Sequence, residues 1–333
     1  MIKLSIDDLC EKLKQSKKTL ILCHKNPDPD TLGSAFSLKE ILEYYGSDVS
    51  VACCDSPSRK LEFITGKTDF EYTGEEYERI IAVDVASGAQ LGDYEFLSKK
   101  VDIVIDHHAM NTRFCDYYED FTAACCEIIM SIADTLGITD KLSKHFFECV
   151  YAGISGDTGG FKYSNVMPST HEYASRIIEK GIDHAEINRI IFDSKTVGEI
   201  NAQKVTYEKM KFFCGGKLAV VEFTNEMKKE YGIEETDITD IVNYIRCIEG
   251  VLVAVSIKQS PKEEKKYAIS SRANCDIDVA SVCAKMGGGG HKRAAGAVIM
   301  ACTPKDAFDV VLPLFEEAVD KYSCKCQCCK TVK

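Results

Sequence analysis

Short apolar runs alternate with helix-like segments through the first half of the chain, and this alternation constrains the fold more than any other feature. A brief apolar run bounded by turn residues is typical of a buried strand, and apolar residues at helical spacing are typical of a covering helix. We expect strands over residues 19–23, 48–53, 79–85 and 101–105, and helices over about 32–45, 122–136, 143–155 and 170–180. This succession predicts an α/β fold with a mostly parallel sheet covered by helices on both faces.

A second, smaller α/β pattern begins after a polar helical stretch over about residues 193–211. We expect its strands over 217–223, 251–258, 266–272 and 295–299, and its helices over 238–246, 279–285 and 304–322. The chain is long enough for two domains. We therefore predict a first domain over residues 1–190, a helical linker over 191–212, a second domain over 213–323 and a cysteine-rich tail over 324–333.

Charge and cysteine content exclude several classes of protein. The formal net charge of −11 argues against binding to long duplex nucleic acid, where a basic face supplies most of the affinity, but leaves short phosphate ligands open. We find neither a signal peptide nor a transmembrane helix, so we expect a cytoplasmic protein without a membrane partner. Most of the 17 cysteines lie in apolar segments and are expected as reduced thiols. Four of the 17 lie in the tail, where they either hold a soft metal, respond to oxidation or belong to a frayed terminus: Cys324, Cys326, Cys328 and Cys329.

Acidic residues and histidines gather at the ends of the expected strands and, once, at the end of an expected helix. They are His24, Asp28, Asp30, Asp84, Asp106, His107, His108 and Asp157. The carboxyl ends of parallel strands form the edge at which such sheets bind ligands. Carboxylates and imidazoles without a cysteine suit Mn²⁺ or Mg²⁺ better than structural zinc. The sequence therefore predicts a metal-dependent hydrolase.

Each of these residues also has an ordinary structural interpretation. A single Asp at a strand end is more often a helix cap or a turn former than a metal ligand. Indeed, we expect Asp30 and Thr31 to cap the helix that begins near Leu32. Several strand ends that carry an acid or a histidine together favour the metal site.

The second domain carries a candidate phosphate-binding segment. Four glycines at 287–290 precede His291, Lys292 and Arg293. Glycines such as Gly288, Gly289 and Gly290 let the backbone approach an anion closely, although a flexible loop is the alternative. Arg272, at the end of an expected strand, has the geometry for a bidentate bond to a terminal phosphate.

Two aromatic residues near Asp157 have two interpretations that the sequence leaves open. Phe161 and Tyr163 either stack on a base of the substrate or alternate along a half-buried strand.

These motifs, in this order, resemble the DHH phosphoesterase superfamily. The matching segments are HKNPDPD at 24–30, Asp84, the triplet Asp106-His107-His108 and GDTGG at 156–160. GGGGH at 287–291 together with Arg272 resembles the DHHA1 domain of this superfamily. The stretch DTGGFKYSN at 157–165 is similar to the branch of bifunctional oligoribonucleases (nanoRNases) and 3′-phosphoadenosine 5′-phosphate (pAp) phosphatases.

The resemblance implies two Mn²⁺ ions, with Mg²⁺ or Co²⁺ as alternatives. One ion would be held by His24, Asp28 and Asp84, and the other by Asp30, Asp84, His107 and Asp157. Asp84 would bridge the ions, Asp106 would orient a neighbouring ligand, and His108 would face the scissile phosphate. Arg272, His291, the adjoining glycines and Asn26 would bind the remainder of the substrate.

The activity implied is hydrolysis of RNA fragments of roughly two to five nucleotides to mononucleotides, of pAp to AMP and phosphate, or of both, by a hydroxide that two metals activate. A manganese inorganic pyrophosphatase and a phosphodiesterase for other small phosphoanhydrides or for pApA-type products remain alternatives. A RecJ-like exonuclease is disfavoured because a basic character is absent. A nucleotide-sensing module without catalysis is the rival from another class, and a homodimer is left open.

Overall fold

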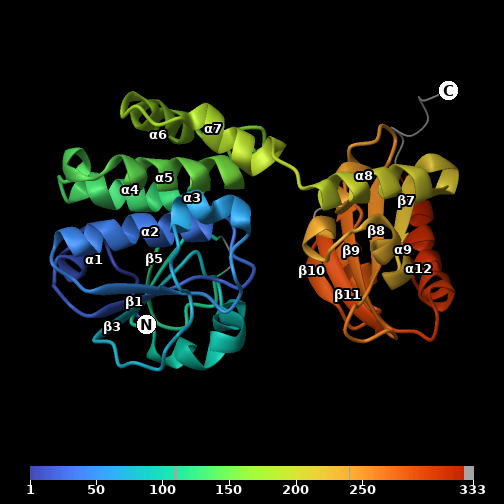
Figure 1. Cartoon of the computed structure of the whole chain (residues 1–333), viewed down its shortest axis with the longest axis horizontal. Coiled ribbons are helices and arrows are strands. Elements are labelled where there is room, and N and C mark those ends of the chain that lie inside the picture. The colour runs from blue at the N-terminus through green and yellow to red at the C-terminus, as the bar shows by residue number, and fades with distance from the viewer. Residues whose placement is uncertain (109–110, 240, 326–333) are drawn as a thin grey trace. The chain divides into compact units, whose positions relative to one another are not determined.

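The computed structural model describes residues 1–108, 111–239 and 241–325. The chain forms two compact units, Met1–Ser194 and Lys195–Lys333, drawn in blue to green and in yellow to red in Figure 1. The predicted cysteine-rich tail lies outside the described residues, apart from the backbone at the end of the last helix. In the part of the chain that is described, no helix combines the length and the apolar character needed to cross a membrane.

The first unit is built on a parallel sheet of five strands in the order β2-β1-β3-β4-β5. The strands are β1 (Thr19–Leu22), β2 (Val49–Ala52), β3 (Arg79–Val83), β4 (Ile103–Asp106) and β5 (Asp116–Glu119). The expected α/β class and the mostly parallel sheet are confirmed. Because β2 lies on one side of β1 and β3 on the other, the strand order reverses next to β1, which is where such sheets form ligand sites.

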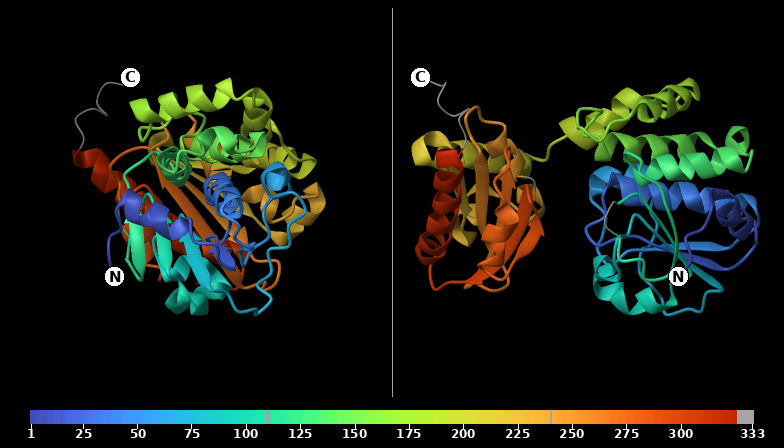
Figure 2. Two further views of the ribbon diagram at one scale, coloured as in Figure 1. Left: turned by 90° about the vertical axis from the view of Figure 1, so that its left-hand side faces the viewer. Right: turned by 180° about the vertical axis from the view of Figure 1, so that it is seen from behind.

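Helices cover one face of this sheet in two layers. They are α1 (Ile6–Leu13), α2 (Pro29–Tyr44), α4 (Cys125–Thr135), α5 (Lys144–Asp157), α6 (Pro168–Glu179) and α7 (His184–Asn188), with the short α3 (Glu62–Thr65) beside α2. The helices α2 and α4 pack on the strands, and α5 packs on both of them, as the views from the front and from behind show (Figures 1 and 2). The opposite face is covered by the 3₁₀ segment η2 (Gly88–Lys100), which buries Leu91 and Leu97.

The start of α2 differs from the expectation. Asp28, and not Asp30 or Thr31, is the N-cap, because its carboxylate accepts hydrogen bonds from the backbone N–H groups of Asp30 and Thr31, both at 3.0 Å. Pro29 occupies the first turn, where its fixed φ and missing N–H are tolerated. Asp30 therefore lies inside the first helical turn and is fully buried.

The second unit contains a mixed sheet of six strands in the order β10-β11-β9-β8-β7-β6. The strands are β6 (Lys211–Phe213), β7 (Leu218–Phe223), β8 (Val253–Gln259), β9 (Lys266–Ala273), β10 (Gly289–His291) and β11 (Ala294–Met300). The helices are α8 (Val197–Lys209), α9 (Asn225–Tyr231), α10 (Ile241–Arg246), α11 (Val279–Ala284) and α12 (Pro304–Lys325). Side chains of α11 and α12 pack on one face, and those of α8 and α10 on the other.

The glycine run is only partly a loop. Gly289 and Gly290 belong to β10, which pairs antiparallel with β11. A Cβ at Gly290, where φ is +139°, would lie 2.6 Å from the Ala294 carbonyl oxygen, and a Cβ at Gly288 would overlap the Gly296 carbonyl. Close approach between these two strands accounts for both glycines.

Candidate metal centre

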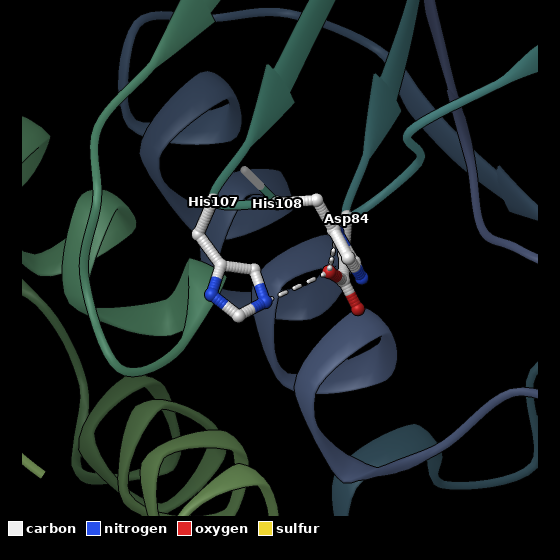
Figure 3. Close-up of side chains that lie close together, drawn as sticks. All are labelled: Asp84, His107 and His108. Carbon is white, nitrogen blue, oxygen red and sulfur yellow. Dashed lines mark ion pairs between the residues drawn. The ribbon is translucent and has the colours of Figure 1, made fainter. Parts of the chain in front are cut away.

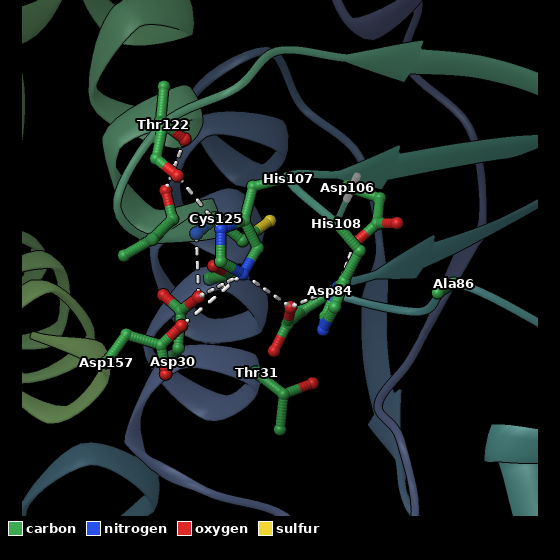
Figure 4. A network of polar contacts seen from close by, with 12 residues as sticks. Asp30, Thr31, Asp84, Ala86, Asp106, His107, His108, Thr122, Cys125 and Asp157 are labelled. Carbon is green, nitrogen blue, oxygen red and sulfur yellow. Dashed lines mark hydrogen bonds and ion pairs between the residues drawn. The ribbon is translucent and has the colours of Figure 1, made fainter. Parts of the chain in front are cut away.

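The predicted acidic and histidine residues meet at the carboxyl edge of the first sheet. Figure 4 shows Asp30, Asp84, Asp106, His107, His108 and Asp157 of this set. His24 and Asp84 follow β1 and β3, Asp106 ends β4 with His107 and His108 directly after it, Asp28 and Asp30 begin α2, and Asp157 ends α5. Among the described residues, three groups of side chains have ligand atoms close enough to hold a metal ion: Asp84, His107 and His108; His24, Asp28 and Asp84; and Asp30, His107 and Asp157. Strands adjacent in space but distant in sequence thus supply one compact centre.

Asp84 lies between the histidines of this centre. Its Oδ2 is 3.4 Å from His24 Nε2. Its Oδ1 is 3.5 Å from both His107 Nε2 and His108 Nδ1, which Figure 3 shows with it. Its backbone has φ +57°, a left-handed conformation unusual outside glycine. The Asp84 N–H donates to the Ile105 carbonyl at 2.9 Å, which ties this turn to β4.

His24 has its ring oriented for metal binding through Nε2. Its Nδ1 is 2.8 Å from the Lys25 carbonyl, which can only accept, so Nδ1 carries the proton. Its Nε2 then points at carboxylates, 3.6 Å from Asp28 Oδ2 and 3.4 Å from Asp84 Oδ2. A hydrogen bond from the other ring nitrogen is the usual way in which a protein orients a histidine ligand.

His107 repeats this arrangement in the second group. Its Nδ1 donates to the Thr122 carbonyl at 3.1 Å, while its Nε2 is 3.3 Å from Asp157 Oδ2 and 3.8 Å from Asp30 Oδ2. The Asp30 carboxylate also accepts the N–H groups of Cys125 and Cys126, at 2.6 and 2.9 Å. These amides are the free donors at the start of α4, so the helix fixes Asp30 from 95 residues away.

Asp106 is fully buried and contacts His108 rather than the other carboxylates. Its Oδ1 accepts from His108 Nδ1 at 2.7 Å, and its Oδ2 accepts from Asn111 Nδ2 at 2.6 Å. His108 is the most exposed histidine of the centre, with 40% of its side chain accessible. The sequence did not indicate Asn111, because its only signal is a position five residues after Asp106.

The centre carries more negative charge than its surroundings neutralise. Burial, together with the neighbouring carboxylates, raises the pKa of Asp30 and of Asp157. Burial alone would lower the pKa of the histidines, but the nearby carboxylates raise the pKa of His24 to about 11 and of His107 to about 10. Without cations, protons compensate the charge that divalent ions would neutralise.

The donor set fits two divalent cations. Oxygen and imidazole donors surround Asp84, and two of the buried atoms at its centre, Asp84 Oδ1 and His107 Nε2, have no hydrogen-bond partner among the described residues. Unsatisfied buried polar atoms are rare in proteins, and an ion is one of the few ways to satisfy them.

The remaining candidate residues of the first unit follow His24 and Asp157 closely in the sequence. The Asn26 N–H donates to Asp55 Oδ2 at 2.8 Å. Phe161 and Tyr163 are in the turns that follow α5, so the alternative of a half-buried strand is wrong. The Phe161 ring stacks on His171 with centroids 5.5 Å apart, and the Tyr163 ring covers Gly159 while remaining 53% exposed.

The candidate phosphate-binding residues lie together in the second unit. Arg272 of β9 pairs with Ala294 of β11, and Ala294 pairs with His291 of β10, so three neighbouring strands bring these residues into one row. The Arg272 Nη1 donates to the Ser271 carbonyl at 3.0 Å. His291, Lys292 and the glycines of β10 are exposed.

Comparisons with known proteins agree with this architecture. Residues 18–154 match the N-terminal domain of the DHH family, and residues 203–321 match the DHHA1 domain. The bifunctional oligoribonuclease and PAP phosphatase NrnA of Thermus thermophilus is 26% identical over 307 residues, 90% of each chain. The probable enzyme of the same name from Streptococcus mutans is 28% identical over 291 residues, 86% of this chain and 91% of the relative.

An exopolyphosphatase-related protein from Bacteroides fragilis has the same fold. Its crystal structure superposes with a TM-score of 0.85 over 95% of this chain and 96% of that chain, at 22% identity. The two family matches thus show a DHH N-terminal domain followed by a DHHA1 domain, and enzymes of the DHH family are phosphoesterases that depend on divalent metal ions.

Proposed function

We propose that this protein hydrolyses short oligoribonucleotides to mononucleotides and pAp to AMP and phosphate, with two Mn²⁺ ions in the centre around Asp84. The observation that carries the proposal is the position of Asp84, whose two carboxylate oxygens face different histidines at 3.4 and 3.5 Å. The names of the Thermus and Streptococcus relatives, both similar over most of their length, support the choice of substrates.

The residues divide between the two ions as follows. His24 and Asp28 would hold one ion, His107, Asp30 and Asp157 would hold the other, and Asp84 would contribute one oxygen to each. Oxygen and imidazole donors suit Mn²⁺. Such a pair of ions supplies Lewis acidity toward the phosphate and lowers the pKa of bound water.

His108 and Asp106 have a separate role in this proposal. The hydrogen bond from Nδ1 to Asp106 raises the pKa of His108 and so favours the imidazolium form, in which Nε2 also carries a proton. Its Nε2–H remains the atom that can donate to a phosphoryl oxygen, where negative charge builds up during hydrolysis. Asp106 fixes the orientation of this ring and does not itself contact the substrate.

The second unit would bind the non-scissile end of the substrate. The row formed by Arg272 and His291, with the exposed backbone of β10 beside it, offers a guanidinium, an imidazole and N–H groups to a phosphate. With the net charge of −11, a short substrate that carries one or two such phosphates is favoured over a long duplex.

The test is a comparison of substrates with purified protein and Mn²⁺. We expect turnover of pAp and of a 5′-phosphorylated RNA dinucleotide, and its loss in Asp84→Asn. Hydrolysis of pyrophosphate alone, or of pApA alone, would assign the protein to another branch of the family. Mn²⁺ binding without turnover of any of the four compounds would refute the proposal.

A further inference from the structure

Gln90 connects the two loops that carry His24 and Asp84, although it belongs to neither metal group. Its side-chain Oε1 accepts the backbone N–H groups of Ala86 at 2.6 Å and of Ser87 at 3.1 Å. Its backbone carbonyl accepts the N–H of Lys25 at 2.7 Å. A single residue at the start of η2 therefore hydrogen-bonds the loop after β1 and the loop after β3.

Both loops contain a strained residue beside the metal centre. Asn26 has φ +53° and Asp84 has φ +57°. Residues with a side chain keep such a conformation only where the surrounding structure determines it several times over. Gln90 bonds the residue before Asn26 and the two residues that follow Val85, so it restrains both strained turns.

Gln90 is itself fixed by its neighbours. Gly92 follows in a turn with φ +59°, and a Cβ there would lie 2.5 Å from Cys54 Sγ and 3.2 Å from Lys25 Cβ. The backbone of this segment is thus packed directly on the loop after β1. Close packing on one side and the hydrogen bonds of Oε1 on the other leave little freedom in the separation of the two loops.

We infer that Gln90 is a positioning residue that fixes the separation of His24 and Asp84, and thereby the geometry in which they bind one of the two cations. The inference rests on the proposed function, which assigns His24 and Asp84 to that cation and takes the cation to be Mn²⁺. A residue that orients metal ligands without contacting the metal typically changes metal affinity or activity 10- to 100-fold when replaced.

Two substitutions distinguish the effect of the Gln90 hydrogen-bond acceptor from the effect of its side-chain size. Gln90→Met keeps the length but removes the acceptor of the Ala86 and Ser87 N–H groups, whereas Gln90→Glu keeps an acceptor at the same place. Thr112→Val is the matched control. It removes the hydroxyl that donates to the Ala86 carbonyl at 3.2 Å, but that carbonyl still accepts the Thr112 N–H at 2.8 Å, so the loop after β3 keeps this bond.

The primary measurement is a titration of metal-free protein with Mn²⁺ alone, followed by calorimetry or by electron paramagnetic resonance. We expect Gln90→Met to weaken one binding step about tenfold or more, and Gln90→Glu and Thr112→Val to stay within about threefold of wild type. With pAp, we expect kcat of Gln90→Met to fall by a similar factor while KM changes less than about threefold.

Wild-type Mn²⁺ affinity in Gln90→Met would overturn the inference, and so would an equal loss in Gln90→Glu. If Gln90→Met does not fold, Gln90→Asn, whose amide is one methylene too short to reach both N–H groups, decides the question in the same titration. Failure of wild-type protein to hydrolyse pAp would refute the proposed function, but the binding curves of the variants would still test Gln90.

Discussion

Replacement of Gly153 by alanine tests whether the packing of α5 fixes the metal centre. Gly153 faces α2 and α4, and a Cβ there would overlap Cys126 Sγ, lie 2.7 Å from Asp30 Oδ1 and lie 2.9 Å from Cys126 Cβ. Cys126 and Asp30 are both fully buried, so neither can move into solvent. The added methyl group must displace a carboxylate of the centre or move the helix.

Two opposing terms give the magnitude. Alanine is favoured over glycine in a helix interior by about 1 kcal/mol. Overpacking a core by one methyl group costs about 1–3 kcal/mol, and the number of contacts at Gly153 places this case at the upper end. We expect Gly153→Ala to lower the free energy of unfolding by about 2 kcal/mol.

Urea denaturation of the metal-free protein measures this change, and a Mn²⁺ titration reports the position of Asp30. Gly156→Ala is the control, because the atoms nearest to a Cβ one turn later on α5 would be Pro29 side-chain carbons at 3.0, 3.1 and 3.6 Å. For this control we expect a change of less than about 1 kcal/mol. Wild-type stability together with wild-type Mn²⁺ affinity in Gly153→Ala would refute the reasoning.

Three further predictions concern charge in and around the centre. Asp84→Asn should reduce the rate of hydrolysis at least about 1000-fold, because both ions lose a charged ligand. Circular dichroism checks that the variant folds, and residual turnover above about 1% of the wild-type rate would contradict the bridging role of Asp84. Mn²⁺ affinity should rise from pH 6 to pH 8, because the raised pKa values of His24 and His107 mean that metal binding displaces protons from these rings. Calorimetry in buffers of different ionisation enthalpy counts the protons released, and release of no protons would contradict metal binding by these histidines. Burial raises the pKa of Glu127 on α4, so at a pH above the ordinary pKa of a glutamate the buried ionised carboxylate destabilises the folded state. Glu127→Gln should therefore stabilise the protein more at pH 8 than at pH 4.5 in urea titrations. Equal stabilisation at the two pH values would contradict a raised pKa.

Much of the centre could be predicted because its residues follow recognisable strands. The apolar run before Asp84 and the run before Asp106 both became central strands of the first sheet. Their side chains then had to lie at the carboxyl edge, since each parallel strand ends there. The strands that sequence reasoning missed are short, polar or glycine-rich: β5 reads DYYE, β6 reads KFF and β10 reads GGH. All three are edge strands, where one side of the backbone is free and burial imposes no apolar pattern. The short helices α1 and α9 were missed as well.

By itself, then, the sequence determined the fold class, the strand ends and the set of residues available as ligands, because hydrophobic periodicity and local motifs are properties of neighbouring residues. Only the tertiary structure decided which strands are adjacent and how the ligands are held. The bonds from the α4 amides to Asp30 and from the Lys25 N–H to the Gln90 carbonyl join segments whose proximity no local pattern encodes. Long-range backbone hydrogen bonds depend on where loops bring the chain back, and that geometry forms only when the whole sheet is assembled.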